Sequence, residues 1–287
     1  MGVLHEASHF LADMSLALTD IQSQAKRIDC ETPSGRQVWH VWNQTGGNPL
    51  VLLHGGSGSW NHWLRNVLPL SQSRAVWAVD LPGMGDSTLP PNAMDADDLH
   101  EPLAQAMHRL WGETAVDVVG FSFGGLVLGF LAAAHPRCIK RMVMVGIPGL
   151  GISNPITNMR GFREGMTLED RYAVHRHNLQ AIMLTRAHAI TPELLHMQAH
   201  NVQRDRMRRR RIARSDAMLH VMPRWQCEVH GIWGEHDALY QGSLDRIEGL
   251  LAACDLRSFH VVKDAGHWVQ YEQAEAFNQH LQQCLPL

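Results

Sequence analysis

A serine between two glycines, in the G-F-S-F-G motif at 120–124, is the first candidate for chemistry in this sequence. A serine hydroxyl can attack a carbonyl carbon, and G-x-S-x-G is typical of a sharp strand-to-helix turn that exposes the serine. An apolar run at 116–119 precedes the motif, and a helical pattern over 125–134 follows it. We therefore predict that Ser122 is a nucleophile, and that both glycines are there because the turn leaves no room for larger residues.

The serine needs a general base, and the chain contains 19 histidines. We select His267 because it follows the last predicted strand, where the chain returns to the carboxyl edge of the sheet. Asp237 follows the preceding predicted strand and lies between serine and histidine in the chain, so it is the predicted acid that orients the imidazole. Glu235 is the alternative acid. The predicted catalytic residues are therefore Ser122, Asp237 and His267.

Attack on a carbonyl produces an oxyanion, which must be stabilised by preorganised N–H groups. The H-G-G-S-G run at 54–58 follows an apolar strand pattern and could approach the nucleophile closely. We predict that the backbone N–H groups of Gly56 and Phe123 form this oxyanion hole. A phosphate-binding loop is the alternative for a glycine-rich run, but neither G-x-G-x-x-G nor the lysine of a P-loop is present.

Short apolar runs alternating with amphipathic stretches must position these residues. The predicted strands among these runs are 50–53, 75–79, 116–119, 141–145, 229–233 and 258–262. Two more strands, 26–31 and 36–43, are predicted as an opening β-pair because Pro33, Ser34 and Gly35 between them favour a turn. The predicted helices of the core are 60–70, 96–110, 125–134, 243–251 and 273–284. This alternation predicts an α/β fold with a mostly parallel eight-stranded sheet flanked by helices.

The alternation is interrupted between 149 and 223, which lacks a convincing buried strand and is rich in Arg, His and Met at helical spacing. Sheet elements lie on both sides of this segment. We interpret residues 149–223 as a helical lid inserted into a core formed by 1–148 and 224–287.

Together these features resemble the α/β-hydrolase superfamily over nearly the whole chain outside the insertion. The L-P-G-M-G-D-S run at 81–87 is similar to that family's loop after the fourth strand. G-H-W-V-Q-Y-E at 266–272, followed by Phe277 and Asn278, resembles the C-terminus of carbon–carbon hydrolases that cut meta-cleavage products of aromatic ring breakdown. The resemblance implies a cytoplasmic enzyme that acts on a small molecule, is often oligomeric and needs no cofactor.

The chain departs from those carbon–carbon hydrolases in its predicted substrate pocket, which comprises Gly55, Phe121, Gln198 and Trp268. Phe121 replaces an asparagine typical of that family, and Gln198 aligns with an arginine that grips the substrate carboxylate, while Trp268 is retained. A buried carboxylate without a cation is costly. We therefore expect hydrolysis, through an acyl-enzyme, of a small carboxylic ester or lactone with a largely neutral, apolar portion. Carbon–carbon hydrolysis of a 2-hydroxy-6-oxo-dienoate is the alternative, and a catalytically silent binding protein is a third.

The composition adds few constraints. The net charge of −3 gives no reason to expect a nucleic-acid partner, and five scattered cysteines without C-x-x-C spacing indicate reduced thiols in a cytoplasmic protein. No apolar stretch is long enough for a membrane span or a secretory signal. The spacing of apolar residues over 8–21 predicts an amphipathic helix that packs on the domain or on a dimer partner, with a membrane anchor as the alternative.

Two further patterns could suggest other functions. Seven arginines between Arg204 and Arg214 could form a nucleic-acid surface, but they form no single stripe on a helix, so a solvated lid helix with acidic neighbours is the expectation. His196 and His200 have the i, i+4 spacing of a metal pair, but Met197 stands where a zinc protease has glutamate. We therefore expect no metal there.

Overall fold

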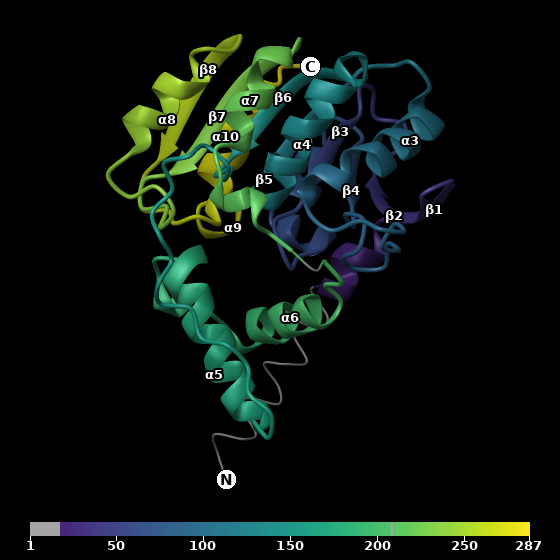
Figure 1. Cartoon of the computed structure of the whole chain (residues 1–287). Helices are drawn as coiled ribbons and strands as arrows, with labels where there is room; N and C mark the ends of the chain where they lie inside the picture. The colour runs from purple at the N-terminus through teal and green to yellow at the C-terminus, as the bar shows by residue number, and fades with distance from the viewer. Residues whose placement is uncertain (1–17, 208) are drawn as a thin grey trace.

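The computed structural model describes residues 18–207 and 209–287 and contains a mixed eight-stranded sheet in the order β1-β2-β4-β3-β5-β6-β7-β8 (Figure 1). The strands are β1 (Lys26–Thr32), β2 (Gly35–Trp42), β3 (Leu50–Leu53), β4 (Val76–Val79), β5 (Val116–Phe121), β6 (Ile139–Val145), β7 (Glu228–Gly234) and β8 (Leu256–Val262). Only the β1–β2 and β2–β4 pairs are antiparallel. All eight predicted strands and the mostly parallel sheet are confirmed.

Helices cover both faces of the sheet, because successive apolar side chains of a strand point alternately to the two faces and both must be buried. Along β3, Val51 and Leu53 face one core cluster, whereas Leu50 and Leu52 face the other. The first cluster is covered by α3 (His100–Trp111), α4 (Phe123–Ala134) and α8 (Leu244–Leu251). The second is covered by α2 (Val67–Ser71), α9 (Val269–Glu272) and α10 (Ala274–Cys284). Strands buried on both faces need apolar side chains at consecutive positions.

The helix predicted over 60–70 is wrong as one element, because the structure has a 3₁₀ turn at Trp60–Trp63 and then the short α2. Asp80 Oδ1 accepts a hydrogen bond from the Trp60 N–H (2.9 Å) and so fixes the start of the 3₁₀ turn. The helix predicted over 8–21 lies mostly outside the described residues. Its last part packs through Leu18 and Ile21 against the second core cluster.

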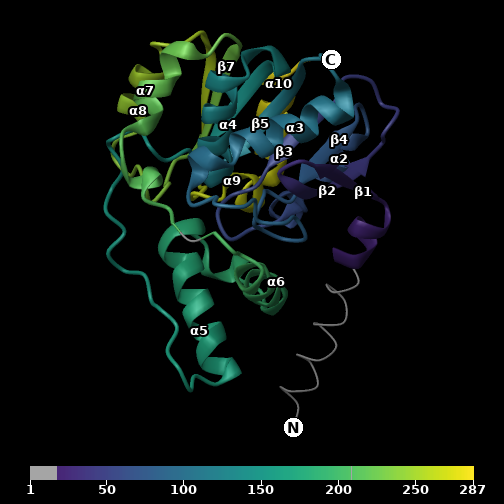
Figure 2. The same cartoon turned by 45° about the vertical axis from the view of Figure 1, so that its right-hand side comes forward.

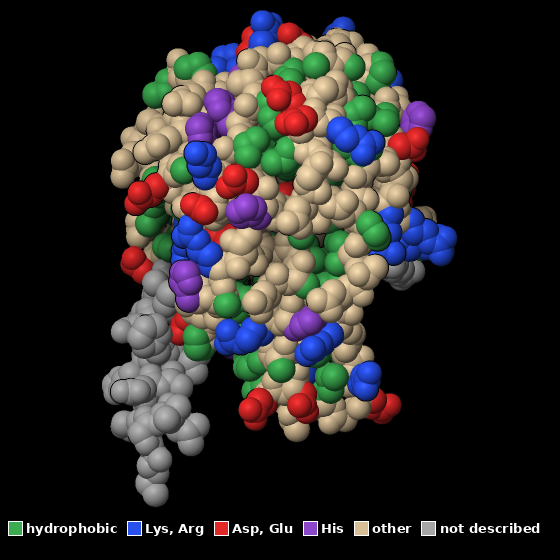
Figure 3. Space-filling view, turned by 90° about the vertical axis from the view of Figure 1, so that its left-hand side faces the viewer, with side chains coloured by type: hydrophobic (Ala, Val, Ile, Leu, Met, Phe, Trp, Pro, Cys, Tyr) green, Lys and Arg blue, Asp and Glu red, His purple; other side chains and the backbone are tan. Residues whose placement is uncertain are grey.

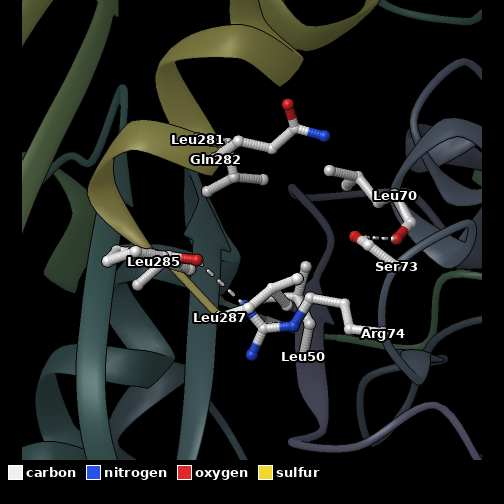
Figure 4. A pocket seen from close by; sticks show the side chains of 9 residues that line it. Leu50, Leu70, Ser73, Arg74, Leu281, Gln282, Leu285 and Leu287 are labelled. Atoms are coloured by element: carbon white, nitrogen blue, oxygen red, sulfur yellow. Dashed lines mark hydrogen bonds between the residues drawn. The ribbon is translucent and has the colours of Figure 1, made fainter.

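A buried cluster of charges lies at the amino end of the central strands. Asp117 on β5 accepts two hydrogen bonds from Arg141 (2.8 and 2.6 Å) and one from Arg74 (2.5 Å). Burial alone would raise the pKa of Asp117, but the hydrogen bonds from the two guanidinium groups outweigh burial and lower it. Arg74 also donates to the Leu285 carbonyl, so the cluster joins the sheet to the segment after α10 (Figure 4).

The chain between β6 and β7 leaves the core as a projection that contains α5 (Leu168–Asn178) and α6 (Pro192–Gln203), and it returns to the core at α7 (Ala217–Val221) (Figures 1 and 2). Met218 and Val221 of α7 pack in the first core cluster. Viewed from the side, the surface of the projection mixes hydrophobic, basic and acidic side chains (Figure 3). Residues 152–163 within it form neither helix nor strand. Among the described residues, no helix is both long and apolar enough to cross a membrane.

The helix predicted for the arginine cluster is wrong. The helix α6 ends at Gln203, and the described residues that follow are irregular up to a 3₁₀ turn at Ile212–Arg214. Backbone N–H groups in this segment bind core loops instead of helical carbonyls: Arg206 N–H donates to Gly83 O (2.8 Å), and Arg209 N–H donates to Met94 O (3.1 Å). Tertiary contacts therefore replace the helix that local spacing favours.

Candidate active site

The predicted nucleophile lies on a tight turn between β5 and α4. Ser122 has φ 50° and ψ −117°, a conformation that non-glycine residues rarely adopt. A Cβ atom added at Gly120 would lie 2.5 Å from Gly125 Cα, and one at Gly124 would lie 2.4 Å from His54 O. The turn therefore needs glycine on both sides of the serine, as predicted from the motif.

Ser122, His267 and Asp237 form a continuous hydrogen-bonded chain. Ser122 Oγ lies 2.9 Å from His267 Nε2, and His267 Nδ1 lies 2.8 Å from Asp237 Oδ2. A carboxylate can only accept, so Nδ1 carries the proton and Nε2 is left to accept from the serine hydroxyl. Asp237 is fully buried, and its Oδ1 accepts a hydrogen bond from the Leu239 N–H (2.9 Å). The carboxylate is thus held in one orientation.

The alternative acid, Glu235, does not reach the imidazole. Its Oε2 accepts a hydrogen bond from the Asp264 N–H (3.1 Å), and its side chain is 43% exposed. Gly146, at the end of β6, passes close to the triad instead: a Cβ atom there would lie 3.0 Å from His267 Cε1 and 3.1 Å from Asp237 Oδ2. Its φ of +55° also favours glycine. The sequence analysis did not identify this close approach.

The two predicted oxyanion-hole residues, Gly56 and Phe123, line one cavity together with Ser122. Neither of their backbone N–H groups donates a hydrogen bond within the part of the chain that the structure describes. The fully buried His54 holds the loop before Gly56. Its Nδ1 donates to Gly55 O (2.8 Å), and its Nε2 accepts from the Leu81 N–H (2.9 Å). Burial lowers the pKa of His54, which keeps this ring neutral and able to accept.

Arg210 from the arginine segment lies against both predicted oxyanion-hole residues. The sequence analysis did not predict this contact of Arg210. Its Cζ lies 3.3 Å from the position of a Cβ atom at Gly56 and 5.3 Å from the centre of the Phe123 ring. Its Nη1 donates to Ser57 Oγ (3.0 Å), its Nη2 pairs with Asp205, and the Ser57 hydroxyl donates to Asp205 (2.6 Å). The guanidinium charge is therefore neutralised locally, and the ion pair connects the projection to the glycine loop.

The cavity at the serine has a volume of about 740 Å³. The predicted pocket residues Gly55, Phe121 and Gln198 line it, and Gln198 Oε1 has no hydrogen-bond partner among the described residues. Apolar side chains of the projection supply much of the remaining wall. These are Ile156, Met159, Phe162, Leu179, Ile182 and Met183.

The prediction that Trp268 belongs to this pocket is wrong. Trp268 is fully buried outside the cavity lining, and its indole N–H donates to the His62 carbonyl (3.1 Å). Its ring lies 4.6 Å from the ring of His62, centre to centre. Burial, together with the neighbouring His54 and His267, lowers the pKa of His62 well below its usual value, so His62 packs as a neutral aromatic ring. Trp268 therefore packs against His62 behind the cavity wall and does not line the cavity.

The charged residues of the cavity lining are Arg160, Arg210 and Arg214, and the described residues that line it include no aspartate or glutamate. Arg160 and Arg214 form no ion pair within residues 18–207 and 209–287. In contrast, Arg204 does not line the cavity and forms an ion pair with Asp86. This pair agrees with the expectation that acidic neighbours accompany the arginine cluster. The cavity lining is therefore mostly apolar, with unpaired positive charge at Arg160 and Arg214 within the described chain.

The histidine pair considered as a metal site makes other contacts. His196 Nδ1 lies 3.2 Å from the Tyr172 hydroxyl, and His200 Nε2 accepts a hydrogen bond from Arg204 (3.0 Å). Each ring thus has a partner of its own on the projection.

The model of the alpha/beta hydrolase family matches residues 50–280. The chain belongs to this family. It is 30% identical over 246 residues to 2-hydroxymuconate semialdehyde hydrolase of Pseudomonas sp. (strain CF600), covering 80% of this chain and 84% of that protein. It is 28% identical over 256 residues to the dihydrolipoyllysine-residue acetyltransferase component of the acetoin cleaving system of Pseudomonas putida, covering 85% of this chain but 65% of that protein. A carboxylesterase of Bacillus subtilis has the same fold, with a TM-score of 0.72 at 20% identity, over 98% of this chain and 99% of that one.

Proposed function

We propose that this α/β-hydrolase hydrolyses a small carboxylic ester or lactone through an acyl-enzyme on Ser122. The observation that carries the proposal is the hydrogen-bonded chain from Ser122 through His267 to the buried Asp237. It supplies a nucleophile, a base with a free Nε2 lone pair and an acid that fixes the tautomer, in the geometry that serine hydrolysis requires.

In the proposed reaction, Ser122 Oγ forms a bond to the carbonyl carbon as His267 Nε2 takes the hydroxyl proton. The resulting oxyanion accepts hydrogen bonds from the N–H groups of Gly56 and Phe123, which are otherwise unused among the described residues. His267 then protonates the leaving oxygen, and the acyl-enzyme forms. Water, deprotonated by His267, attacks the acyl-enzyme and returns the serine.

The substrate portion next to the serine is proposed to be apolar. Phe121 stands against Gly55, and a Cβ atom at Gly55 would lie 2.8 Å from the Phe121 ring. Leu179, Ile182 and Met183 line the same cavity from the projection. We infer that residues 149–223 act as a lid because they supply most of the wall that faces the serine.

Carbon–carbon hydrolysis of a meta-cleavage product is the second candidate, and the cavity arginines favour it. The preference for a neutral substrate assumed that no cation replaces the arginine missing at Gln198. Arg160 and Arg214 line the cavity and have no carboxylate partner in the described chain, so that reason no longer holds. Several hydrolases of meta-cleavage products are also among the distant relatives.

Covalent labelling tests the nucleophile. A fluorophosphonate should modify Ser122, detected by peptide mass spectrometry, and Ser122→Ala should abolish labelling and nearly all hydrolysis of a chromogenic short-chain ester. Ser73→Ala, far from the cavity, is the matched control and should keep both. Labelling of a different serine, or full activity in Ser122→Ala, would refute the assignment.

A kinetic comparison separates the two candidates. If the proposed ester or lactone hydrolysis is correct, kcat/KM should be higher for short esters and lactones than for 6-oxo-hexa-2,4-dienoate, because the cavity wall supplied by Leu179, Ile182 and Met183 is apolar. Faster cleavage of the dienoate would instead assign the enzyme to carbon–carbon hydrolysis, with Ser122 retaining its role.

A further inference from the structure

Three potential metal ligands meet away from the cavity, where α3 begins and α4 ends. His100 and Glu101 are the first two residues of α3, and His135 directly follows α4. One ligand atom from each residue lies within 4.8 Å of those from the other two. His135 Nε2 lies 2.9 Å from Glu101 Oε2, and the two imidazole rings lie 5.6 Å apart, centre to centre.

One nitrogen of each imidazole ring at this place is shielded from solvent and makes no hydrogen bond with a described residue. These atoms are His100 Nδ1 and His135 Nε2. The contact between His135 Nε2 and Glu101 is an ion pair only when the imidazole is protonated. Buried polar atoms without a partner are rare because each loses its hydration without compensation, so each calls for a specific explanation.

We propose that His100, Glu101 and His135 bind one zinc ion. Two imidazole nitrogens and one carboxylate oxygen form a common three-ligand zinc set, which leaves a fourth position for water. Glu101 and His135 also line an open cavity of about 500 Å³, from which an ion and its water can enter. Magnesium and calcium prefer oxygen ligands only, so the two imidazoles select against them.

The ion would connect two helices rather than take part in hydrolysis. The helix α4 has 12 residues and carries Ser122 at its other end, so the proposed site lies about 18 Å along the helix from the nucleophile. An ion held by both helices stabilises the folded chain, because the three ligands come together only in the fold. The proposal is thus independent of the substrate.

Metal content and thermal stability test the proposal on the full chain. After equilibration with excess Zn²⁺ and gel filtration, the wild type should retain one more zinc per chain than His135→Gln, measured by plasma mass spectrometry. Zn²⁺ should raise the Tm of the wild type by several degrees and that of His135→Gln by less, whereas Mg²⁺ should shift neither. Glu101→Gln should weaken zinc binding about tenfold, measured by calorimetry, because it removes an anionic ligand.

His108→Gln is the matched control, because His108 lies on α3 and contacts Glu113, just after the helix, at 3.3 Å but without a third ligand. This variant should bind zinc like the wild type. Far-UV circular dichroism before metal addition checks that each variant is folded. Equal zinc content in the wild type and His135→Gln would overturn the proposal, as would an equal loss in His108→Gln.

Discussion

The carboxyl edge of the sheet and the arginine segment of the projection both contribute to the proposed active site, but they are positioned by different forces. At the sheet edge, Ser122 and Asp237 are fixed by backbone turns that directly follow strands. In the segment after α6, Arg210 is fixed by an ion pair with Asp205 and by a hydrogen bond to Ser57, which lies on a loop distant in sequence. Strand and turn patterns can be read locally, whereas such tertiary contacts cannot. The chemistry of this enzyme family is therefore easier to predict than the specificity.

The largest expected effect lies at the sheet edge. Asp237→Asn should lower kcat for a short-chain ester by about 10⁴-fold, because an amide can hydrogen-bond to the wrong imidazole tautomer. Glu235→Gln, the matched control two residues away, should change kcat less than about twofold, since Glu235 binds the Asp264 N–H instead. A large loss of kcat in Glu235→Gln, with little loss in Asp237→Asn, would show that Glu235 and not Asp237 orients His267.

The buried charge cluster at the amino end of the central strands should show the next largest effect, which is on the stability of the fold. Asp117→Asn should lower the free energy of unfolding at pH 7 by about 3–5 kcal/mol, because it leaves Arg74 and Arg141 buried without a counter-charge. The measurement is urea unfolding at several pH values. Since the folded-state pKa of Asp117 is lowered, its ionised form stabilises the fold above the unfolded pKa of about 4.

That contribution should be lost as the pH falls through the lower, folded-state pKa. The stability of Asp117→Asn should accordingly depend less on pH in the acid range than that of the wild type. Identical slopes in the two proteins would show that Asp117 does not gain stability from ionisation.

Two of the three arginines that line the cavity, Arg210 and Arg214, should affect different kinetic constants. Arg214 has no ion-pair partner among the described residues, so Arg214→Met should raise KM for an anionic substrate about tenfold and leave a neutral ester unchanged. Arg210 is neutralised by Asp205 and packs on Gly56 and Phe123, so Arg210→Met should lower kcat for both substrates about tenfold through the oxyanion loop. If Arg214→Met changed KM equally for charged and neutral substrates, Arg214 would not bind the anionic group of the substrate.

Particular residues show where prediction from sequence succeeds and where it stops. The central strands follow from apolar runs, whereas the first β-pair follows from the turn at 33–35. The order of Ser122, Asp237 and His267 in the chain selected three residues that the structure brings within hydrogen-bonding distance. Arg210 gave no local signal, because the helix that its spacing favours is replaced by contacts with the core. Trp268 was misplaced because a resemblance in sequence does not reveal that its N–H is already bonded to the His62 carbonyl.

The smallest expected effect concerns Trp268 and separates support of the site from contact with the substrate. Trp268→Phe removes one buried indole N–H and leaves the His62 carbonyl without that donor, which should lower the free energy of unfolding by about 1–3 kcal/mol. Because Trp268 lies outside the cavity lining, KM for esters and for a dienoate should change by less than about twofold. Gln198→Ala is the comparison, since Gln198 lines the cavity and its removal should alter KM with little effect on stability. Denaturant unfolding and steady-state kinetics on the same preparations measure both quantities. A dienoate-specific rise in KM for Trp268→Phe would mean that the indole turns toward the substrate during binding, and it would restore the role that the resemblance implied.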